Sequence, residues 1–316
     1  MAQPSDMFDA FDMVGIKEDL QDIIYDISPT DTPVMSMAKR VKCKQVYHEW
    51  QTDVLAAASA TNHVIEGDDA TTDAQVATVR VGARLNISDK VILVSGTSRA
   101  VDSAGRGDEL DYLVAKNGKE LKRDMESLIC SNNASVTGNN STARETGGFV
   151  SWITSNESRG ATGSDGGFSS GNTVAATDGT QRAFTETLLK EVIREAWDSG
   201  GEPDTLILGS FNKQVMSGFT GNATRQVDAK GEKLYASVDF YKSDFGMIKV
   251  KASRFSRSRD GLLIDPEMIS VGYLRPFQTQ KLAKTGDSDR VQLLAEYCLI
   301  VNNQAAHGHI ADLTTS

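Results

Sequence analysis

Two stretches of alternating residues, joined by a long polar connection, constrain this chain more than any other feature. Residues 78–87 alternate from Val79 to Ile87, and one face of residues 46–54 carries Val46, His48, Trp50, Thr52 and Val54. Alternation of this kind is typical of β-strands with unlike faces. The connection has about 20 residues, whereas ordinary hairpin loops have roughly 2–5. The pattern predicts a long two-stranded arm, which cannot be stable alone in water and needs a neighbour to lie on.

The tip of this arm is acidic and carries no aromatic residue. It contains Glu66, Asp68 and Asp69 around Gly67. A calcium loop of the EF-hand type would need further spaced oxygen ligands and flanking helices, which the sequence does not provide. Two interpretations stay open: a solvated loop, or an electrostatic contact with a neighbouring chain.

A second elongated element is a helix predicted over residues 108–131. Its apolar residues recur three, four and seven apart, with Leu121 and Met125 on the inward stripe. Asp108 suits the N-cap, and the outer face predicts ion pairs between residues three or four apart: Lys116–Glu120, Glu120–Arg123 and Lys122–Glu126. About 24 residues at a rise of 1.5 Å make roughly 36 Å of helix. Gly118 interrupts it, so we expect another backbone to approach closely there.

The remaining segments indicate a mixed architecture. A short helix at residues 17–27 ends before Pro29, and the leading segment has no core of its own. Residues 131–180 are rich in Gly, Ser, Asn and Thr and predict a surface loop anchored around Phe149 and Trp152. Then follow helices at 184–199, with Trp197 inward, and 211–219, and strands at 205–208, 247–250, 262–264, 268–271 and 291–301. We expect the last strand to pair with an earlier sheet.

Composition excludes several classes of protein. A net charge of −10 excludes an ordinary DNA-binding domain, though not a container that holds DNA without adhering to it. Three widely spaced cysteines, Cys43, Cys130 and Cys298, predict isolated reduced thiols. No apolar run is long enough to cross a bilayer, and Met1–Asp6 does not resemble a secretory signal.

Chemical motifs are few. The chain has no P-loop, no GxGxxG and no GxSxG elbow. His307 and His309, with Asp312, could hold a metal, but a structural role is favoured, and His48 suits a packed β-face better than a catalytic base. Arg106-Gly-Asp108 spells an adhesion tripeptide, which the N-cap role of Asp108 explains better. We therefore expect no enzyme, and no catalytic, cofactor-binding or metal-binding residue.

The order of these segments, with Trp50 in its alternating stretch, resembles the major capsid proteins of tailed bacteriophages. More specifically, it resembles a major head protein family of podophages and siphophages whose members often carry only the label of a domain of unknown function. The resemblance extends from about residue 17 to residue 313 and is carried by Thr32-Pro-Val-Met-Ser-Met-Ala-Lys39, His48-Glu-Trp-Gln-Thr-Asp53, Val64-Ile-Glu-Gly-Asp-Asp69, Gly118-Lys-Glu-Leu-Lys-Arg-Asp-Met-Glu126, Phe211-Asn-Lys-Gln214, Phe219-Thr-Gly-Asn-Ala-Thr224 and Tyr273-Leu-Arg-Pro-Phe277.

This resemblance implies the α+β Johnson fold of tailed-phage capsid proteins. Residues 1–45 would form the N-terminal arm, 46–95 the extended β-loop, and 96–183 a peripheral domain with the spine helix 108–131 and the Gly/Ser-rich loop. Residues 184–276 would form the axial domain, and 277–316 would return to the peripheral domain. Trp50, Glu66, Asp68 and Asp69 are then the candidate residues for contacts between subunits.

The implied function is a major capsid protein that self-assembles through hexamers and pentamers into an icosahedral head around double-stranded DNA, without sequence-specific binding. The expected partners are a separate scaffolding protein, the portal and a possible decoration protein, and no membrane. The protein would reside in the virion after assembly in the host cytoplasm. An encapsulin-like cage, a secreted surface or adhesin protein and, last, an enzyme stay as alternatives.

The resemblance also concerns how the shell is held together. Some members of this fold join their subunits by isopeptide bonds from a lysine near the loop tip, and no lysine occurs between Lys44 and Lys90. We therefore expect a shell without covalent cross-links. Because the arm begins almost at Met1, without the long helical extension of some relatives, we also expect no N-terminal trimming.

Overall fold

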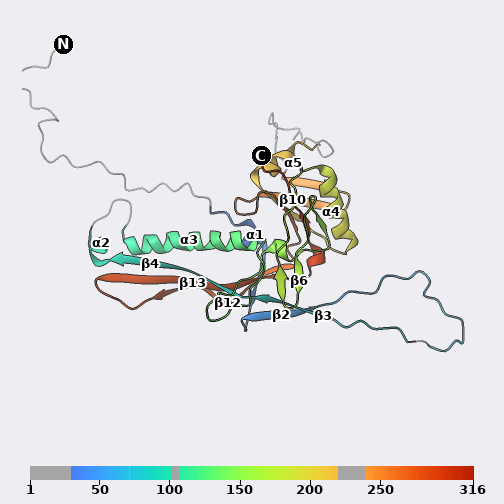
Figure 1. Cartoon of the computed structure of the whole chain (residues 1–316), viewed down its shortest axis with the longest axis horizontal. Helices are drawn as coiled ribbons and strands as arrows, with labels where there is room; N and C mark the ends of the chain where they lie inside the picture. Colours follow the sequence, from blue (N-terminus) through green and yellow to red (C-terminus); the bar gives the residue numbers. More distant parts are fainter. Residues whose placement is uncertain (1–29, 71, 102–106, 220–238) are drawn as a thin grey trace, which may run out of the picture.

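Two long antiparallel strands, β12 (Ile269–Lys281) and β13 (Ser288–Val301), run through the middle of an elongated α+β fold (Figure 1). The structure, a computed structural model, describes residues 30–70, 72–101, 107–219 and 239–316. β1 (Lys39–Lys42) pairs parallel with β12, and β4 (Asn86–Ser95) pairs antiparallel with β13, completing a four-stranded sheet. The predicted strand at 268–271 thus belongs to this sheet, as the start of the longer β12.

Helix α3 (Glu109–Ile129) lies along one face of this sheet (Figure 1) and confirms the predicted long helix. The Asp108 side chain accepts a hydrogen bond from the Leu110 N–H at 2.9 Å, as an N-cap does. Leu121 and Met125 are buried against the sheet, as predicted. The prediction for Gly118 is wrong: nothing lies within 4 Å of the position a Cβ would occupy there. At Gly118 no other described segment comes close to the helix.

A six-stranded sheet forms the other part of the fold, in the order β5-β14-β11-β8-β10-β9. The strands are β5 (Glu157–Ser158), β14 (Gly308–Ile310), β11 (Gly261–Ile264), β8 (Thr205–Leu208), β10 (Gly246–Ala252) and β9 (Phe240–Ser243). Helices α4 (Glu186–Asp198) and α5 (Ser210–Ser217) pack on it. Trp197, expected inward on α4, is instead 52% exposed beside Phe245. After β13 the chain passes η3 (Gln304–Ala306) and ends in the six-stranded sheet through β14.

The predicted arm is a ribbon of β2 (Tyr47–Thr52) and β3 (Val79–Arg84), paired antiparallel with Trp50 opposite Val81. The pairing of the two alternating stretches is confirmed, but the second stretch divides. Its last part belongs to β4, because Leu85 is fully buried and the chain enters the four-stranded sheet there. Beyond Thr52 the described residues up to Val79 form an extended loop without strand pairing (Figure 1).

The Gly/Ser-rich stretch is more ordered than the predicted surface loop. Its anchor is confirmed, since Phe149 in η1 (Phe149–Ser151) and the following Trp152 are both buried. The stretch also forms a hairpin of β6 (Gly167–Ser169) and β7 (Asn172–Val174). Asn132 holds its far end by donating to the Ala176 carbonyl at 2.7 Å and accepting from the Ala176 N–H at 2.8 Å. Hydrogen bonds of this kind, from a side chain to the backbone, order a segment whose residues have a low propensity for helix or strand.

Two short helices complete the described chain: α1 (Pro33–Met37) and α2 (Gly96–Ala100). None of the helices in the described ranges combines the length and the apolar character that a bilayer crossing requires. The predicted helix at residues 17–27 lies outside the described residues.

The buried stripe of α3 leads to a stability prediction. Replacing Leu121 or Met125 by alanine should lower the free energy of unfolding by about 2–5 kcal/mol, because a cavity remains in a packed core. Ser127→Ala, on the exposed side of the same helix, should change it by less than about 0.5 kcal/mol. Urea unfolding of the isolated protein measures both values, and equal losses for all three variants would contradict the assigned stripe.

Candidate functional site

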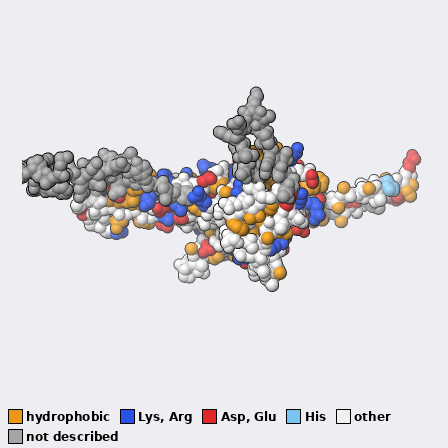
Figure 2. All heavy atoms as spheres, turned by 90° about the horizontal axis from the view of Figure 1, so that it is seen from above, with side chains coloured by type: hydrophobic (Ala, Val, Ile, Leu, Met, Phe, Trp, Pro, Cys, Tyr) orange, Lys and Arg blue, Asp and Glu red, His pale blue; other side chains and the backbone are white. Residues whose placement is uncertain are grey.

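The distal part of the ribbon exposes apolar side chains that the described chain does not cover. Leu55 is 92% exposed and Ile65 is 77% exposed, and Val54, Val64 and Val76 are similarly open to solvent. Apolar surface gathered on a segment without a core usually marks a binding surface. In Figure 2 this segment projects far from the body of the molecule and ends in acidic side chains. Within the described chain nothing is available to bury these residues, so the ribbon carries a candidate surface for contact with another molecule.

The three acidic residues of the tip point into solvent. Gly67 takes a φ of +84°, which turns the chain there, and the Asp68 N–H donates to the Ile65 carbonyl at 3.1 Å. The Asp69 N–H donates to the Asp68 carboxylate at 3.0 Å. Glu66, Asp68 and Asp69 form no ion pair with any part of the chain that the structure describes. Their charges remain available to an external cation.

Trp50 lies at the base of the ribbon and is engaged within its own chain. Its indole N–H donates to the Asn302 carbonyl at 3.0 Å, and its ring centroid lies 5.7 Å from that of Trp152. Trp152 in turn stacks on Phe168 at 5.7 Å, and His48 lies on the same ribbon face as Trp50. Trp50 therefore fixes the direction in which the ribbon leaves the body, and the structure does not bring it near the tip carboxylates.

A buried carboxylate attaches the N-terminal segment to the long helix. The two oxygens of Glu126 on α3 accept hydrogen bonds from the Val34 and Met35 N–H groups, both at 2.8 Å. These are free donors of the first turn of α1, where Pro33 occupies the first helical position. Burial raises the pKa of Glu126, while the two backbone hydrogen bonds oppose that rise. Sequence analysis missed this contact because it assigned Glu126 to the solvated face, paired with Lys122.

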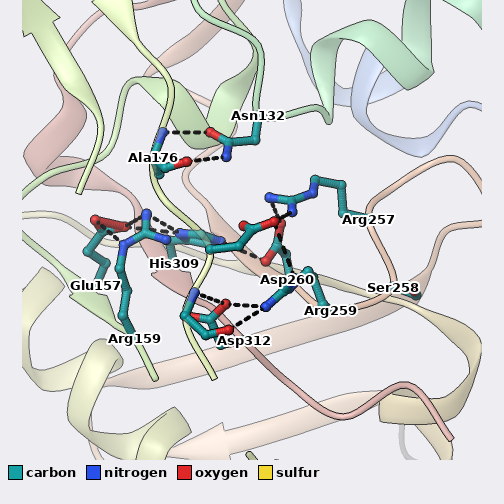
Figure 3. A network of polar contacts seen from close by, with 12 residues as sticks. Asn132, Glu157, Arg159, Ala176, Arg257, Ser258, Arg259, Asp260, His309 and Asp312 are labelled. Atoms are coloured by element: carbon teal, nitrogen blue, oxygen red, sulfur yellow. Dashed lines mark hydrogen bonds and ion pairs between the residues drawn. The ribbon is translucent and has the colours of Figure 1, made fainter. Parts of the chain in front are cut away.

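A second network fastens the Gly/Ser-rich stretch to the six-stranded sheet (Figure 3). Glu157 on β5 pairs with Arg159 at 2.6 Å, and its carboxylate lies 3.0 Å from Nδ1 of His309 on β14. On its other side, Nε2 of His309 lies 3.5 Å from Asp260, which pairs with Arg257 at 3.0 Å. Burial disfavours the charged imidazole of His309, but the flanking Asp260 and Glu157 carboxylates raise its pKa overall.

Asp312 continues the network at the end of the chain. It pairs with Arg259 at 2.6 Å and accepts from the Gly179 N–H at 2.8 Å and the Gly160 N–H at 3.1 Å (Figure 3). Removing one partner from a buried pair leaves an uncompensated charge and typically costs about 3–5 kcal/mol. These contacts therefore hold a glycine-rich segment that has little apolar surface of its own.

His307 and Asp108, which were considered for metal binding and adhesion, each make structural contacts instead. His307 accepts from the Asp265 N–H at 3.1 Å and lies edge-on to Phe149, and burial lowers its pKa to about 4. Among the described residues, no group of three or more possible metal ligands comes together. Asp108 caps α3 and pairs with Arg99 at 2.5 Å, while Arg106 lies outside the described residues.

Two of the cysteines are not isolated, contrary to expectation. Cys43 and Cys298 contact each other across β12, and the Cys43 N–H donates to the Tyr273 carbonyl at 2.8 Å. Gly272 makes room for them, because a Cβ there would lie 2.5 Å from the Cys43 Sγ. Both are free and buried thiols.

Comparison with known proteins decides what these surfaces belong to. Residues 4–314 match the family described as SU10 major capsid protein. The chain belongs to this family. The major capsid protein of Escherichia phage Phieco32 is 28% identical over 252 residues, which cover 70% of this chain and 71% of that protein. The prediction of a phage major capsid protein, which forms capsid shells, is thereby confirmed.

Solved structures confirm the tailed-phage capsid fold. A capsid chain of cyanophage A-1(L) superposes with a TM-score of 0.67 at 14% identity, covering 95% of this chain and 98% of that one. A capsid chain of a native GTA particle superposes with a TM-score of 0.63 at 10% identity, covering 96% and 98%. An encapsulin from Synechococcus elongatus has a TM-score of 0.54 at 10% identity, covering 93% and 94%. The major capsid protein family is a family of structural proteins, which removes the support for the adhesin alternative.

The Glu126 contact leads to a prediction for the N-terminal segment. Glu126→Gln replaces one acceptor oxygen with an N–H donor, so one buried N–H of α1 loses its partner at a cost of about 1–3 kcal/mol. Glu126→Ala should cost more, and Glu120→Gln, whose half-exposed carboxylate lies 3.9 Å from the Lys90 ammonium, should change little. Urea unfolding combined with limited proteolysis around residues 30–38 checks this. Equal protease resistance in all three variants would show that the carboxylate does not hold α1.

The contacts of Glu157 and Arg159 also predict a pH dependence through Asp165, which lies 3.0 Å from Arg159. Hydrogen bonding to Glu157, with burial and the charge of Glu157, raises the pKa of Asp165 to about 6, although Arg159 opposes this rise. Folding therefore favours protonated Asp165, and this contribution is complete below its ordinary value of 3.8 and lost as pH rises through about 6. Asp165→Asn keeps a donor toward Glu157 without the charge. The Tm of the variant should equal that of the parent near pH 4 and exceed it at pH 7.5; a constant difference across this range would refute the assignment.

Proposed function

We propose that many copies of this major capsid protein close an icosahedral head around the double-stranded DNA of a tailed phage, with the extended loop of each copy lying on its neighbour. The observation that carries the proposal is the distal loop itself, whose apolar residues are exposed and whose three carboxylates form no ion pair within the described chain. Such a segment loses conformational entropy on ordering, which only burial against another subunit can offset.

The outer face of the four-stranded sheet is the proposed landing surface. Val91 and Leu93 on β4 are each 56% exposed on the face opposite α3, and Ile87 lies on the same face. Arg290 is the ladder partner of Leu93 and adds a cation beside this apolar row. The surface thus matches the loop of a second copy in its apolar residues, and Arg290 offers a cation to the acidic tip, although the exposed Asp89 lies on the same face. Trp50 would set the direction of the loop, and Glu66, Asp68 and Asp69 would make the contact.

Further partners extend this proposal. Hexamers and pentamers would build the shell, a separate scaffolding protein would guide its assembly, and a portal would occupy one vertex. A decoration protein is supported by the phage G capsid, which was solved with decoration proteins and whose chain superposes with a TM-score of 0.54 at 8% identity. The shell would assemble in the host cytoplasm, remain in the virion without covalent cross-links, and hold DNA without reading its sequence.

An encapsulin-like cage is the second candidate, favoured only by the shared fold. The contents of purified particles separate the two functions. Double-stranded DNA inside supports a phage head, and a protein cargo without DNA supports a cage.

The acidic tip leads to a test of assembly. Replacing Glu66, Asp68 and Asp69 together by lysine should leave folded, soluble subunits that form few closed shells in electron micrographs, because tip and landing surface would repel. A control with Glu191, Asp198 and Glu202 replaced by lysine makes the same charge change on exposed residues around the end of α4. Unchanged assembly of the tip variant at both low and physiological salt would show that the tip is only solvated.

A further inference from the structure

The charges in the second half of α3 are separated by side, and the acidic side chains there are all engaged. None of the three ion pairs predicted along this helix forms. Glu120 and Asp124 turn toward Lys90 on β4, at 3.9 Å and 2.9 Å, and Glu126 is buried under α1. The lysines that were expected to pair with these acids are left without them.

The outward side of α3 therefore carries a row of free cations. Lys116, Lys119 and Lys122 are exposed and form no ion pair with any residue that the structure describes. Arg123 lies with its guanidinium 5.3 Å from the Phe255 ring centroid, and the adjacent Arg254 is exposed. We call these five residues the basic stripe. Residues three apart on a helix advance about 4.5 Å and turn by about 60° around the axis, so the lysines form an oblique row on its surface.

By helical geometry Lys116, Lys119 and Arg123 lie on the side of α3 opposite the buried Leu121 and Met125, whereas Lys122 lies on the flank between the two sides. Figure 2 is seen from that side and shows several basic side chains over the part of the molecule that contains α3 and the four-stranded sheet. The chain as a whole carries a net charge of −10, so the stripe is a local exception in charge. A partner that binds there through charge complementarity is anionic.

Between the cations the surface is small and open. Ala115 is exposed, and nothing lies within 4 Å of a Cβ at Gly118. A protein partner usually needs large apolar anchors in a desolvated pocket, and the two pockets lined by α4, β9 and β10 lie away from this row. A nucleic acid backbone needs only cations that reach its phosphates, and such contacts carry no sequence information.

We propose that the basic stripe of α3 faces the interior of the shell and contacts the phosphate backbone of the packaged double-stranded DNA. This inference rests on the proposed function and adds to it the side of the subunit that meets the genome. A few exposed lysines on an otherwise acidic protein bind weakly and reversibly, which suits a genome that has to leave the shell. The proposal also places the opposite face of the four-stranded sheet, which carries Val91 and Leu93, on the side where the extended loop of the neighbouring subunit lies.

Cross-linking in DNA-filled particles tests the contact directly. Formaldehyde should join DNA to peptides that contain Lys116, Lys119 or Lys122, at a yield about tenfold above that of the control lysines Lys242, Lys251 and Lys281, which are also exposed and without ion pairs among the described residues. An amine reagent too large to enter the particle should label the stripe only after the shell is opened. Labelling of the stripe on intact particles, or equal cross-linking of both sets, would overturn the proposal.

Isolated subunits provide a quantitative check. Replacing Lys116, Lys119 and Lys122 by glutamine should make the slope of log K against log salt, for a short DNA duplex, less negative by about 2.7, since each lost phosphate contact contributes about 0.9. The variant with Lys242, Lys251 and Lys281 replaced by glutamine should keep the parental slope. An unchanged slope in the first variant would contradict the contact.

Two outcomes separate this inference from the function on which it rests. Carbodiimide cross-links from the stripe lysines to carboxylates of another protein segment would show that the partner is a protein and not DNA. The proposed shell function would be unaffected by that result. Failure of the parent protein to form closed shells would instead remove the proposed function itself.

Discussion

The antiparallel pairing of β12 with β13 is the interaction on which the other parts of this capsid protein depend. One end of the pair supports β4 and the helix α3, and the other leads into the segments that join the six-stranded sheet. A single buried cluster runs from Leu121 and Met125 on α3 to Ile207 and Leu262 in the second sheet. Because this core is continuous, the two parts cannot separate without exposing apolar surface. The register between β12 and β13 shifts around Pro276, which cannot donate a hydrogen bond to the neighbouring strand.

Buried polar contacts then fix the segments that the core does not hold. Glu126 binds the N-terminal segment through two backbone hydrogen bonds, and the network around His309 and Asp312 binds the glycine-rich stretch. Carboxylates in apolar surroundings are costly unless their hydrogen bonds are complete, so each contact favours one arrangement over others. The apolar core supplies most of the stability, and these carboxylates decide where the arm and the glycine-rich stretch are attached.

The subunit is thus rigid in its body and incomplete at its edges. The ribbon leaves the body in a direction set by Trp50 and exposes apolar residues beyond any core of its own. Membership of the SU10 major capsid protein family explains these exposed edges, because a shell protein buries part of its apolar surface against identical neighbours. The two faces of the thin layer formed by α3 and the four-stranded sheet differ accordingly: one is basic along the helix, and the other is apolar along β4.

The sequence by itself determined the long helix, its buried stripe, the pairing of the two alternating stretches and the type of α4, α5, β8 and β10 to β13, though not the short strands of the glycine-rich stretch, β9 or β14. These follow from local periodicity and from caps such as Asp108, which act over a few residues. Only the tertiary structure decided the fate of Glu126, whose partner Val34 lies 92 residues away, and the anchoring of Trp50 to Asn302, 252 residues away. It also brought Cys43 beside Cys298 and left the lysines of α3 unpaired. A helical pattern shows which charges share a face, but whether a charge is buried, paired or free depends on the distant segment that folds against it.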